Sequence, residues 1–518
     1  QPMIQHNRTI QKMSEDKYKI LFIHPDLGIG GAERLVIDYA LGLQECGNDV
    51  KIATSHYSKD HSFEETKNLN IEVYGDFLPR SFKNKFMIIF SILRQLWLVF
   101  YLFFKKDLNN YDFIIVDQLS IGLPLLQYFS SAKIIFYCHF PDLLLSNKQS
   151  SIVKQLYRLP LDFLEQVTTG SSDKLLVNSH FTKDIFYKTF KMLRDRNDVE
   201  VSYPCIDTEL PKIDSETHDI FNKHLGSADS DCEYLISVNR FEKKKNLELA
   251  IKSYHLTLDY MSKARKDKLK LFVCGGYDER VLENKEYLNE LKKLCDDLNL
   301  NYTVIDGKNM ELNNITPKVV KEKLHVIFIK SIPTQLKNLL ISKSSLLLYT
   351  PSNEHFGIVP LESMLLGTPV LAPNNGGPLE TVSQNETGWL IEPKYTEWSR
   401  SILNCLLTID QKEIGPKCKT YAAENFSRKK IVNRNLHDRI LKKLNKEKKV
   451  KSPIFEVFVN SILNLIFFFT TQFLFVSVGG LEKTYLYGAM VAFNLLILKS
   501  FRFGIYWGIL GAMFMQNQ

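Results

Sequence analysis

Short apolar runs alternate with longer segments of helical periodicity along the first 210 residues. The runs are continuously apolar, which is typical of strands buried on both faces of a parallel sheet. They lie at 18–24, 50–54, 71–74, 113–117, 133–139 and 174–178. Between the first two runs, 32–44 has apolar residues at helical spacing. The pattern predicts a doubly wound α/β domain over 17–211, after a polar tail at 1–16.

The same alternation starts again after 212–231, a polar stretch that predicts a linker. The second series of apolar runs lies at 234–238, 269–275, 325–329, 345–350, 369–373 and 388–393. It predicts a second doubly wound domain over 232–443, in which 415–443 form closing helices. Two such domains in succession predict two Rossmann-like lobes that face a cleft.

One helical segment of the first domain is unusually apolar. Residues 86–104 are apolar apart from Arg94, Gln95 and Ser91, and lysines lie on both sides. A central charge argues against a simple membrane span. The segment is either a core helix of the first domain or a helix whose outer face enters a membrane, and we favour the second alternative.

The last part of the chain, 444–518, predicts a basic segment followed by a membrane anchor. Val457 to Val478 is uncharged and long enough to cross a bilayer, although a buried core helix is the alternative. A second apolar stretch, 484–515, either completes a helical hairpin or lies in the interface. The basic residues before the anchor predict that the preceding body is cytoplasmic.

Composition narrows the class of protein. With 45% hydrophobic and 24% charged residues the chain is globular, and neither a collagen nor a wholly disordered protein. Most of the net charge of +8 comes from 439–451, so the rest of the chain gives no sign of nucleic-acid binding. The eight cysteines form no C-x-x-C pair, which favours reduced core residues over zinc ligands.

A glycine-rich loop follows the first predicted strand. It reads HPDLGIGGAER from His24, and Gly30 and Gly31 stand where a helix opens. Helix-end amides there suit an anion, although a tight turn needs glycine for steric reasons alone. The loop lacks the G-x-G-x-x-G spacing, so a dinucleotide enzyme is disfavoured.

One loop of the second domain brings positive charge to the predicted cleft. Arg240 and Lys245 follow the strand at 234–238, where an arginine and a lysine can grip a diphosphate, or form a solvated basic turn. Two further loops at the same sheet edge, and one in the first domain, also carry candidates.

The loop after 345–350 reads EHFGIVPLE. It contains two carboxylates, Glu354 and Glu362, of which one can reach a sugar and the other a ribose diol. Between them, Phe356, Gly357 and Ile358 stand where a helix begins, so that their amides can face a phosphate.

Two more strand ends contribute. The NNGGPLE stretch at 374–380 predicts either another anion site or a structural turn. His139 follows the strand at 133–139, and a histidine at the carboxyl end of a parallel strand is a candidate for cleft chemistry.

Taken together, GIGGAER, YCHFPD, NRFEKKKN, EHFGIVPLE and NNGGPLETV resemble glycosyltransferase family four, whose members are retaining enzymes of the GT-B fold. The resemblance covers about 18–440. HPDLGIGGAERLV, CHFPDLLL, CGGYDERVLEN and YTPSNEHFGIVPLE are similar in particular to the members that extend a dolichol-linked oligosaccharide.

The resemblance implies GDP-mannose as donor, bound mainly by the second domain. Arg240 and Lys245 would hold the diphosphate and take part in catalysis, and Glu362 would hold the ribose hydroxyls. Gly30 and Gly31 would close on the phosphates from the first domain.

The resemblance also implies how the sugar is held. Glu354 and the amides of Phe356 and Gly357, beside that of Ile358, would position the mannose, and His139 would lie near the transferred sugar or the acceptor. Neither half has a D-x-D carboxylate pair at the end of a predicted strand, so we expect no metal ion and no cofactor.

The implied reaction is the addition of α-1,3 and α-1,6 mannose, with retention, to dolichyl-diphosphate-linked Man-GlcNAc2. We expect it at the cytosolic face of the endoplasmic reticulum membrane, with a complex with other early-pathway glycosyltransferases as a further expectation. The alternatives are another lipid acceptor, such as a phosphoinositide or a sterol, and an inactive membrane-tethered scaffold.

Overall fold

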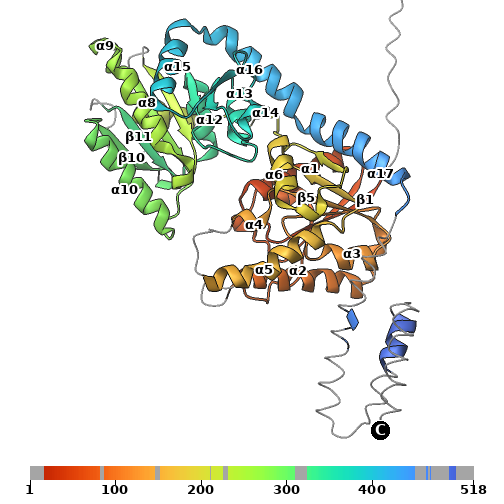
Figure 1. Cartoon of the computed structure of the whole chain (residues 1–518). Coiled ribbons are helices and arrows are strands. Elements are labelled where there is room, and N and C mark those ends of the chain that lie inside the picture. The colour runs from red at the N-terminus through yellow and green to blue at the C-terminus, as the bar shows by residue number, and fades with distance from the viewer. Residues whose placement is uncertain are drawn as a thin grey trace, which may run out of the picture.

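Two parallel sheets of seven strands each form the two lobes of the protein (Figure 1). The structure, a computed structural model, describes residues 17–81, 87–145, 152–210, 212–225, 232–309, 324–449, 463–464, 467 and 489–497. This arrangement confirms the predicted α/β fold with two doubly wound halves.

The first sheet has the order β3-β2-β1-β4-β5-β6-β7. Its strands are β1 (Lys19–His24), β2 (Asp49–Thr54), β3 (Asn70–Val73), β4 (Phe113–Asp117), β5 (Lys133–Cys138), β6 (Lys174–Val177) and β7 (Val199–Val201). Its helices are α1 (Gly31–Glu45), α2 (Met87–Phe104), α3 (Leu123–Phe129), α4 (Asp142–Leu145), α5 (Ile152–Thr169) and α6 (His180–Thr189). Ile20 and Phe22 pack on one face of this sheet and Leu21 and Ile23 on the other, which explains the continuously apolar run.

The second sheet has the order β10-β11-β9-β8-β12-β13-β14. Its strands are β8 (Glu233–Val238), β9 (Leu269–Gly275), β10 (Tyr302–Asp306), β11 (Val326–Lys330), β12 (Leu346–Leu348), β13 (Val370–Pro373) and β14 (Gly388–Ile391). The helices around it are α7 (Ser215–Ile220), α8 (Leu247–Asp259), α9 (Lys263–Lys266), α10 (Leu282–Asp297), α12 (Thr334–Lys343), α13 (Ile358–Leu365), α14 (Pro378–Thr381), α15 (Tyr395–Thr408) and α16 (Gln411–Phe426).

The ends of the second domain differ from the predicted boundaries. Part of the predicted linker 212–231 forms α7, and Ile220 and Phe221 pack in the core of the second lobe. The closing helices return to the first lobe: η8 (Lys429–Leu441) and α17 (Lys442–Lys446) follow α16, and Val432 and Leu436 pack against the α1 side of the first sheet. The long blue helical run in Figure 1 therefore leads from the second lobe back to the first and packs against it.

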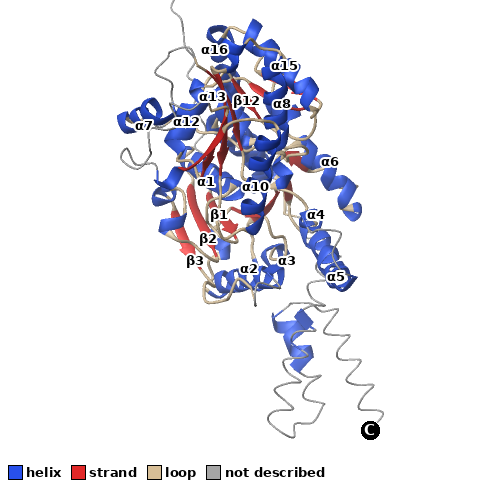
Figure 2. Ribbon diagram, turned by 90° about the vertical axis from the view of Figure 1, so that its left-hand side faces the viewer, coloured by secondary structure: helices blue, strands red, loops and turns tan. Residues whose placement is uncertain are grey.

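The polar tail 1–16 lies outside the described residues, as does most of the predicted membrane anchor. The described parts of its two apolar stretches contact each other: Asn464 Nδ2 donates to Asn494 Oδ1 at 2.8 Å, and the rings of Phe467 and Phe493 stack at 4.0 Å. The described residues 489–497 lie on the side of the first lobe where α2 and α5 lie (Figures 1 and 2).

Candidate functional site

The carboxyl ends of two adjacent central strands carry the charged centre of the site. β8 pairs with β12, so the loops that follow these strands meet at one sheet edge. There Lys245 Nζ donates to Glu354 Oε2 at 2.5 Å, and the hydroxyl of Thr350 donates to the backbone oxygen of Lys245 at 2.6 Å. The structure thus joins two of the predicted site residues that lie 109 positions apart.

Glu354 is held as a carboxylate. Burial by itself raises its pKa, but the Lys245 ammonium, with smaller contributions from His355 and Lys244, lowers the pKa below its ordinary value. Burial beside this carboxylate raises the pKa of Tyr349 well above its usual range, so its hydroxyl stays protonated. The site therefore presents a cation and an anion in contact, with a neutral phenol beside them.

Backbone amides next to this pair are left for a ligand. In the part of the chain that the structure describes, the N–H groups of Phe356, Gly357 and Ile358 donate to no protein acceptor. Gly357 has φ +92°, a left-handed conformation that turns these amides together at the start of α13. Successive amides turned in this way form a concave anion site.

The NNGGPLE loop supports that turn from behind. A Cβ at Gly377 would lie 2.3 Å from the backbone of Phe356, and one at Gly376 would lie 2.7 Å from the backbone oxygen of Glu354. The amide of Gly377 donates to that same oxygen at 2.7 Å. Of the two readings of this loop, the described contacts favour the structural turn, because backbone packs directly on backbone.

The lobes meet beside the site. The ring of Phe140 stacks on His355 at 3.7 Å, and the Ser179 hydroxyl donates to the backbone oxygen of His355 at 2.5 Å. Burial lowers the pKa of His355 to about 4, so it is a neutral imidazole at neutral pH. The carboxylate of Glu380 accepts from the amide of His180 at 2.8 Å, at the start of α6. These contacts place the first lobe against the loop that carries Glu354.

His139 lies at this junction on the first-lobe side. Its Nε2 is 3.0 Å from Asp117 Oδ2, and its side chain is one-fifth exposed. Burial lowers the pKa of its neighbour His355, and the proximity of His139 is a smaller contributor in the same direction. The structure therefore brings His139 near the Lys245–Glu354 pair, on the opposite lobe.

Two predicted site residues have other partners. Arg240 follows β8 as expected, but its side chain is largely exposed and pairs with Glu242 at 3.0 Å. Glu362 on α13 accepts from Lys337 Nζ of α12 at 2.7 Å. Neither residue contacts the Lys245–Glu354 pair, although both stay partly open to a ligand.

The glycine loop of the first lobe has open space before it. A Cβ at Gly31 would meet no described atom within 4 Å, whereas one at Gly30 would lie 2.3 Å from the Glu33 carboxylate. The N–H groups of both glycines lack a protein acceptor in the described structure. The steric alternative for Gly31 is therefore not favoured, because no described residue crowds this position.

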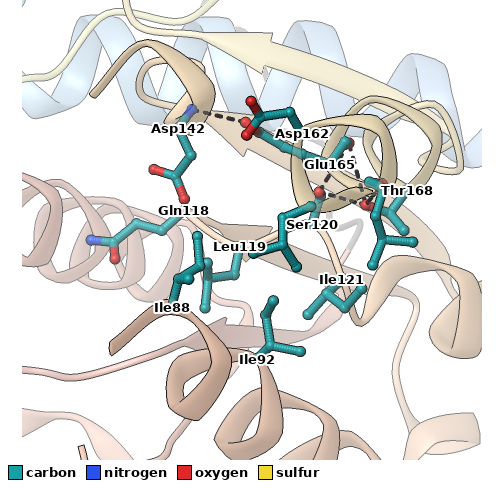
Figure 3. Close-up of a pocket in the computed structure, with 12 residues that line it drawn as sticks. Ile88, Ile92, Gln118, Leu119, Ser120, Ile121, Asp142, Asp162, Glu165 and Thr168 are labelled. Carbon is teal, nitrogen blue, oxygen red and sulfur yellow. Dashed lines mark hydrogen bonds between the residues drawn. The ribbon is translucent and has the colours of Figure 1, made fainter. Parts of the chain in front are cut away.

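A pocket lies between α2 and α5 in the first lobe (Figure 3). It encloses about 400 Å³ of empty space, counting its open mouth, and Gln118, the residue after Asp117, lines it. The remaining lining residues are Ile88, Ile92, Leu119, Ser120, Ile121, Asp142, Leu161, Asp162, Leu164, Glu165 and Thr168. Isoleucines of α2 form one wall, and carboxyl groups lie opposite them. Burial, and then the charge of Asp142, raises the pKa of Glu165 to about 8.

Helix α2 is apolar on the outside and polar on the inside. Arg94 donates to the backbone oxygen of Ser55 at 2.9 Å and Gln95 to that of Leu119 at 2.8 Å, so the charge seen in the sequence faces the lobe. The exposed stripe consists of Met87, Leu93, Trp97, Tyr101 and Phe104. By length and hydropathy this helix qualifies as a span, the one such helix among the described residues, yet its inner face packs in the first-lobe core.

Several site residues were not among those predicted from the sequence. Asp117, His24, Tyr349 and Glu380 were not predicted, because each acts through a partner from a distant strand or lobe. Only the position of Asp117 and His24 at the carboxyl ends of apolar runs marks them. Among the described residues, no three His, Cys, Asp or Glu side chains are grouped so as to hold a metal ion.

Comparison with known proteins agrees with the architecture. The family model described as Glycosyltransferase Family 4 matches 29–210, and the model Glycosyl transferases group 1 matches 221–316 and 302–413. Among solved structures, a sucrose-phosphate synthase from Thermosynechococcus elongatus has a TM-score of 0.60 at 17% identity, covering 81% of this chain and 97% of its own. HepE from Anabaena, solved with UDP and glucose, has a TM-score of 0.55 at 18% identity, covering 80% and 98%. These likenesses show the GT-B-like fold.

Curated relatives are much more similar in sequence. The alpha-1,3/1,6-mannosyltransferase ALG2 of Saccharomyces cerevisiae is 43% identical, over 97% of this chain and 98% of its own. The protein of the same name from Candida albicans is 47% identical, over 82% and 98%. That of Schizosaccharomyces pombe is 42% identical, over 79% and 78%.

Proposed function

Because this chain belongs to glycosyltransferase family 4 and, within it, to the alpha-1,3/1,6-mannosyltransferases, we propose that it transfers mannose from GDP-mannose to dolichyl-diphosphate-linked Man-GlcNAc2. That it is an alpha-1,3/1,6-mannosyltransferase follows from the family. The donor nucleotide, the lipid acceptor and the retention of configuration are our proposal. The observation that carries the proposal is the Lys245–Glu354 pair beside three unpaired amides at the junction of two lobes.

The donor diphosphate would lie between Lys245 and the amides of Phe356, Gly357 and Ile358. A mobile ammonium and a set of helix-end amides both favour a doubly charged anion. Arg240, exposed at the end of β8, would turn from Glu242 towards the same phosphates, and Glu362 would accept hydroxyls of the ribose. From the first lobe, the open space before Gly31 would let a phosphate oxygen approach the backbone.

The same groups supply the chemistry. As the bond from mannose C1 to the phosphate oxygen breaks, negative charge grows on GDP, and Lys245 and the amides stabilise it in place. An acceptor hydroxyl forms the new bond to C1 on the same face, and its proton passes to the departing phosphate oxygen. Glu354, already bound to Lys245, orients the mannose rather than attacking it. In this proposal the reaction needs neither a metal ion nor a cofactor.

The acceptor would come from the membrane to the first lobe. Helices α2 and α5 lie on the side of this lobe where the described residues 489–497 lie (Figure 2). Helix α2 carries the exposed apolar stripe, and both helices line the pocket. We propose that this side rests on the cytosolic face of the endoplasmic reticulum membrane. A complex with other early-pathway glycosyltransferases would then form along the same membrane.

The membrane contact can be tested at Trp97, which is 44% exposed. In vesicles that carry brominated acyl chains, Trp97 fluorescence should be quenched, as measured by the difference between the full chain and its Trp97→Phe variant. Trp398 is fully buried, so Trp398→Phe supplies the matched control: the difference between the full chain and this variant should contain no quenched component. Equal quenching in wild type and Trp97→Phe would reject contact between α2 and lipid.

The reaction is tested with the purified full chain, GDP-mannose and synthetic lipid-linked Man-GlcNAc2, with the linkages of the product mapped. We expect both α-1,3 and α-1,6 mannose, and no transfer to phosphatidylinositol or to a sterol offered in competition. Preferred transfer to either competitor would overturn the acceptor. Absence of GDP binding by calorimetry would favour the inactive scaffold.

A further inference from the structure

A buried carboxylate joins two histidines behind the candidate site. β1, β4 and β5 are neighbours in the first sheet, and their carboxyl ends bring His24, Asp117 and His139 together. Asp117 Oδ1 lies 2.8 Å from His24 Nδ1, and Oδ2 lies 3.0 Å from His139 Nε2. His24 and Asp117 are almost completely buried, whereas His139 reaches the junction of the lobes.

The contacts of His24 require protons on both ring nitrogens. Nδ1 faces the Asp117 carboxylate, and Nε2 faces the backbone oxygen of Asp26 at 3.0 Å. A carbonyl oxygen only accepts, and so does an ionised carboxylate, so each nitrogen must donate. His24 is then an imidazolium, and its charge and that of Asp117 cancel inside the lobe.

The electrostatics of the pair agree with this protonation. Burial by itself lowers the pKa of His24, but the charge and hydrogen bond of Asp117, followed by Glu33 and the Asp26 carbonyl, raise it above its ordinary value. Burial by itself raises the pKa of Asp117, and the two histidines lower it below its usual range. Both shifts favour the charged form of each member, in agreement with the hydrogen-bond geometry.

The hydrogen bond to Asp117 orients the ring of His139. Because Asp117 accepts, His139 donates through Nε2, and Nδ1 has no hydrogen-bond partner among the described residues. Because His24 already neutralises the carboxylate, Asp117 can hold the ring without adding a proton to it. Among the described residues, the aromatic ring of Tyr137 lies 4.8 Å from this ring, and the neutral His355 of the second lobe is also near it.

We propose that His24 and Asp117 are positioning residues which present His139 as a neutral imidazole, with Nδ1 free to accept a hydrogen bond from a sugar hydroxyl. This inference rests on the proposed function, because the hydroxyl belongs to the bound mannose or to the acceptor. In this arrangement His139 binds and orients a hydroxyl and does not act as an acid.

The charge balance is tested with His24→Asn. The asparagine amide can donate to Asp117 from the place of Nδ1 but has no charge, so the carboxylate is left to favour the protonated form of His139. We expect the acidic limb of kcat/KM for GDP-mannose to move to higher pH, by about one unit, which is a tenfold change in proton affinity. An acidic limb that stays in place, in a variant that folds, would overturn the proposal.

A matched control is available at the opposite edge of the same sheet. His437 of η8 is also buried and paired with a carboxylate, Asp438, at 3.1 Å, and its ring lies 5.7 Å from Tyr18, just before β1. His437→Asn removes a buried histidine of the same kind but lies away from the lobe junction. It should leave the acidic limb where it is in the wild type.

The protonation of the ring is tested without any substrate. In the full chain labelled with ¹⁵N-histidine, the signal lost in His139→Gln identifies the ring, and its nitrogen shifts report the tautomer. We expect a proton on Nε2 alone at neutral pH; a proton on Nδ1, or on both nitrogens, would overturn the proposal. Since this readout needs no mannose transfer, it separates failure of the inference from failure of the proposed function, and it stands even where His24→Asn does not fold.

Discussion

The Gly31→Ala substitution should affect the stability of the first lobe and the binding of the donor in opposite ways. Gly31 is the first residue of α1, and an added Cβ would meet no protein atom within 4 Å. Alanine favours a helix over glycine by roughly 0.5–1 kcal/mol in a helix interior, and by less at the first turn, so the free energy of unfolding should stay equal or rise slightly.

Binding should change in the opposite direction. If a phosphate oxygen approaches the amide of Gly31, the new methyl group stands in its way. Loss of one hydrogen bond to a charged group costs about 1.5–3 kcal/mol, which corresponds to a rise in KM for GDP-mannose of about tenfold to a hundredfold.

The assay compares urea unfolding with steady-state kinetics in two variants. Gly377→Ala is the contrast, because its Cβ would lie 2.3 Å from the Phe356 backbone and must displace the amide turn. It should lower both stability and donor binding. An unchanged KM in Gly31→Ala would refute the close approach of the donor, and a loss of stability would refute the open space before Gly31.

Three further predictions follow from charged groups. Lys245→Met removes the cation that we propose stabilises the leaving diphosphate. Single-turnover rates should then fall by about 10²–10³-fold, and wild-type rates would contradict the proposed site. Arg428→Met removes one of two arginines that pair with the buried Asp38, at 3.1 Å. It should lower the free energy of unfolding by about 2–3 kcal/mol in urea titrations. A change below about 0.5 kcal/mol would mean that this ion pair does not stabilise the fold. The pKa of Glu165 is raised to about 8 from 4.5, so the folded state holds its proton longer than the unfolded chain. The thermal midpoint should fall as pH rises through that interval, and fall less in Glu165→Gln.

Apolar periodicity was sufficient to predict the strands that are buried on both faces. The runs at 18–24 and 113–117 correspond to β1 and β4, in the middle of the first sheet. Two edge strands, β7 and β10, were missed, because an edge strand has one neighbour and several of its side chains face solvent. Their sequences are correspondingly short or mixed in polarity.

The candidate site was predicted only as far as its local motifs extend. Lys245, Glu354 and the glycine turn at Gly357 each follow a recognisable strand, and adjacent strands in one sheet then bring them together. The partners of Arg240 and Glu362 could not be predicted, since several side chains compete for each charge once the chain has folded.

The sequence alone thus specified the two-lobed α/β architecture and the residues that we propose bind the donor phosphates, because strand burial and helix-end amides depend on residues nearby in the chain. Which residues are buried together depends on packing between segments far apart. Asp117 becomes the support of His139 only when β1, β4 and β5 lie side by side, and η8 becomes part of the first lobe only when the chain crosses back to it. Burial and hydrogen bonding each need a contacting partner, and the tertiary fold alone determines which distant residue is that partner.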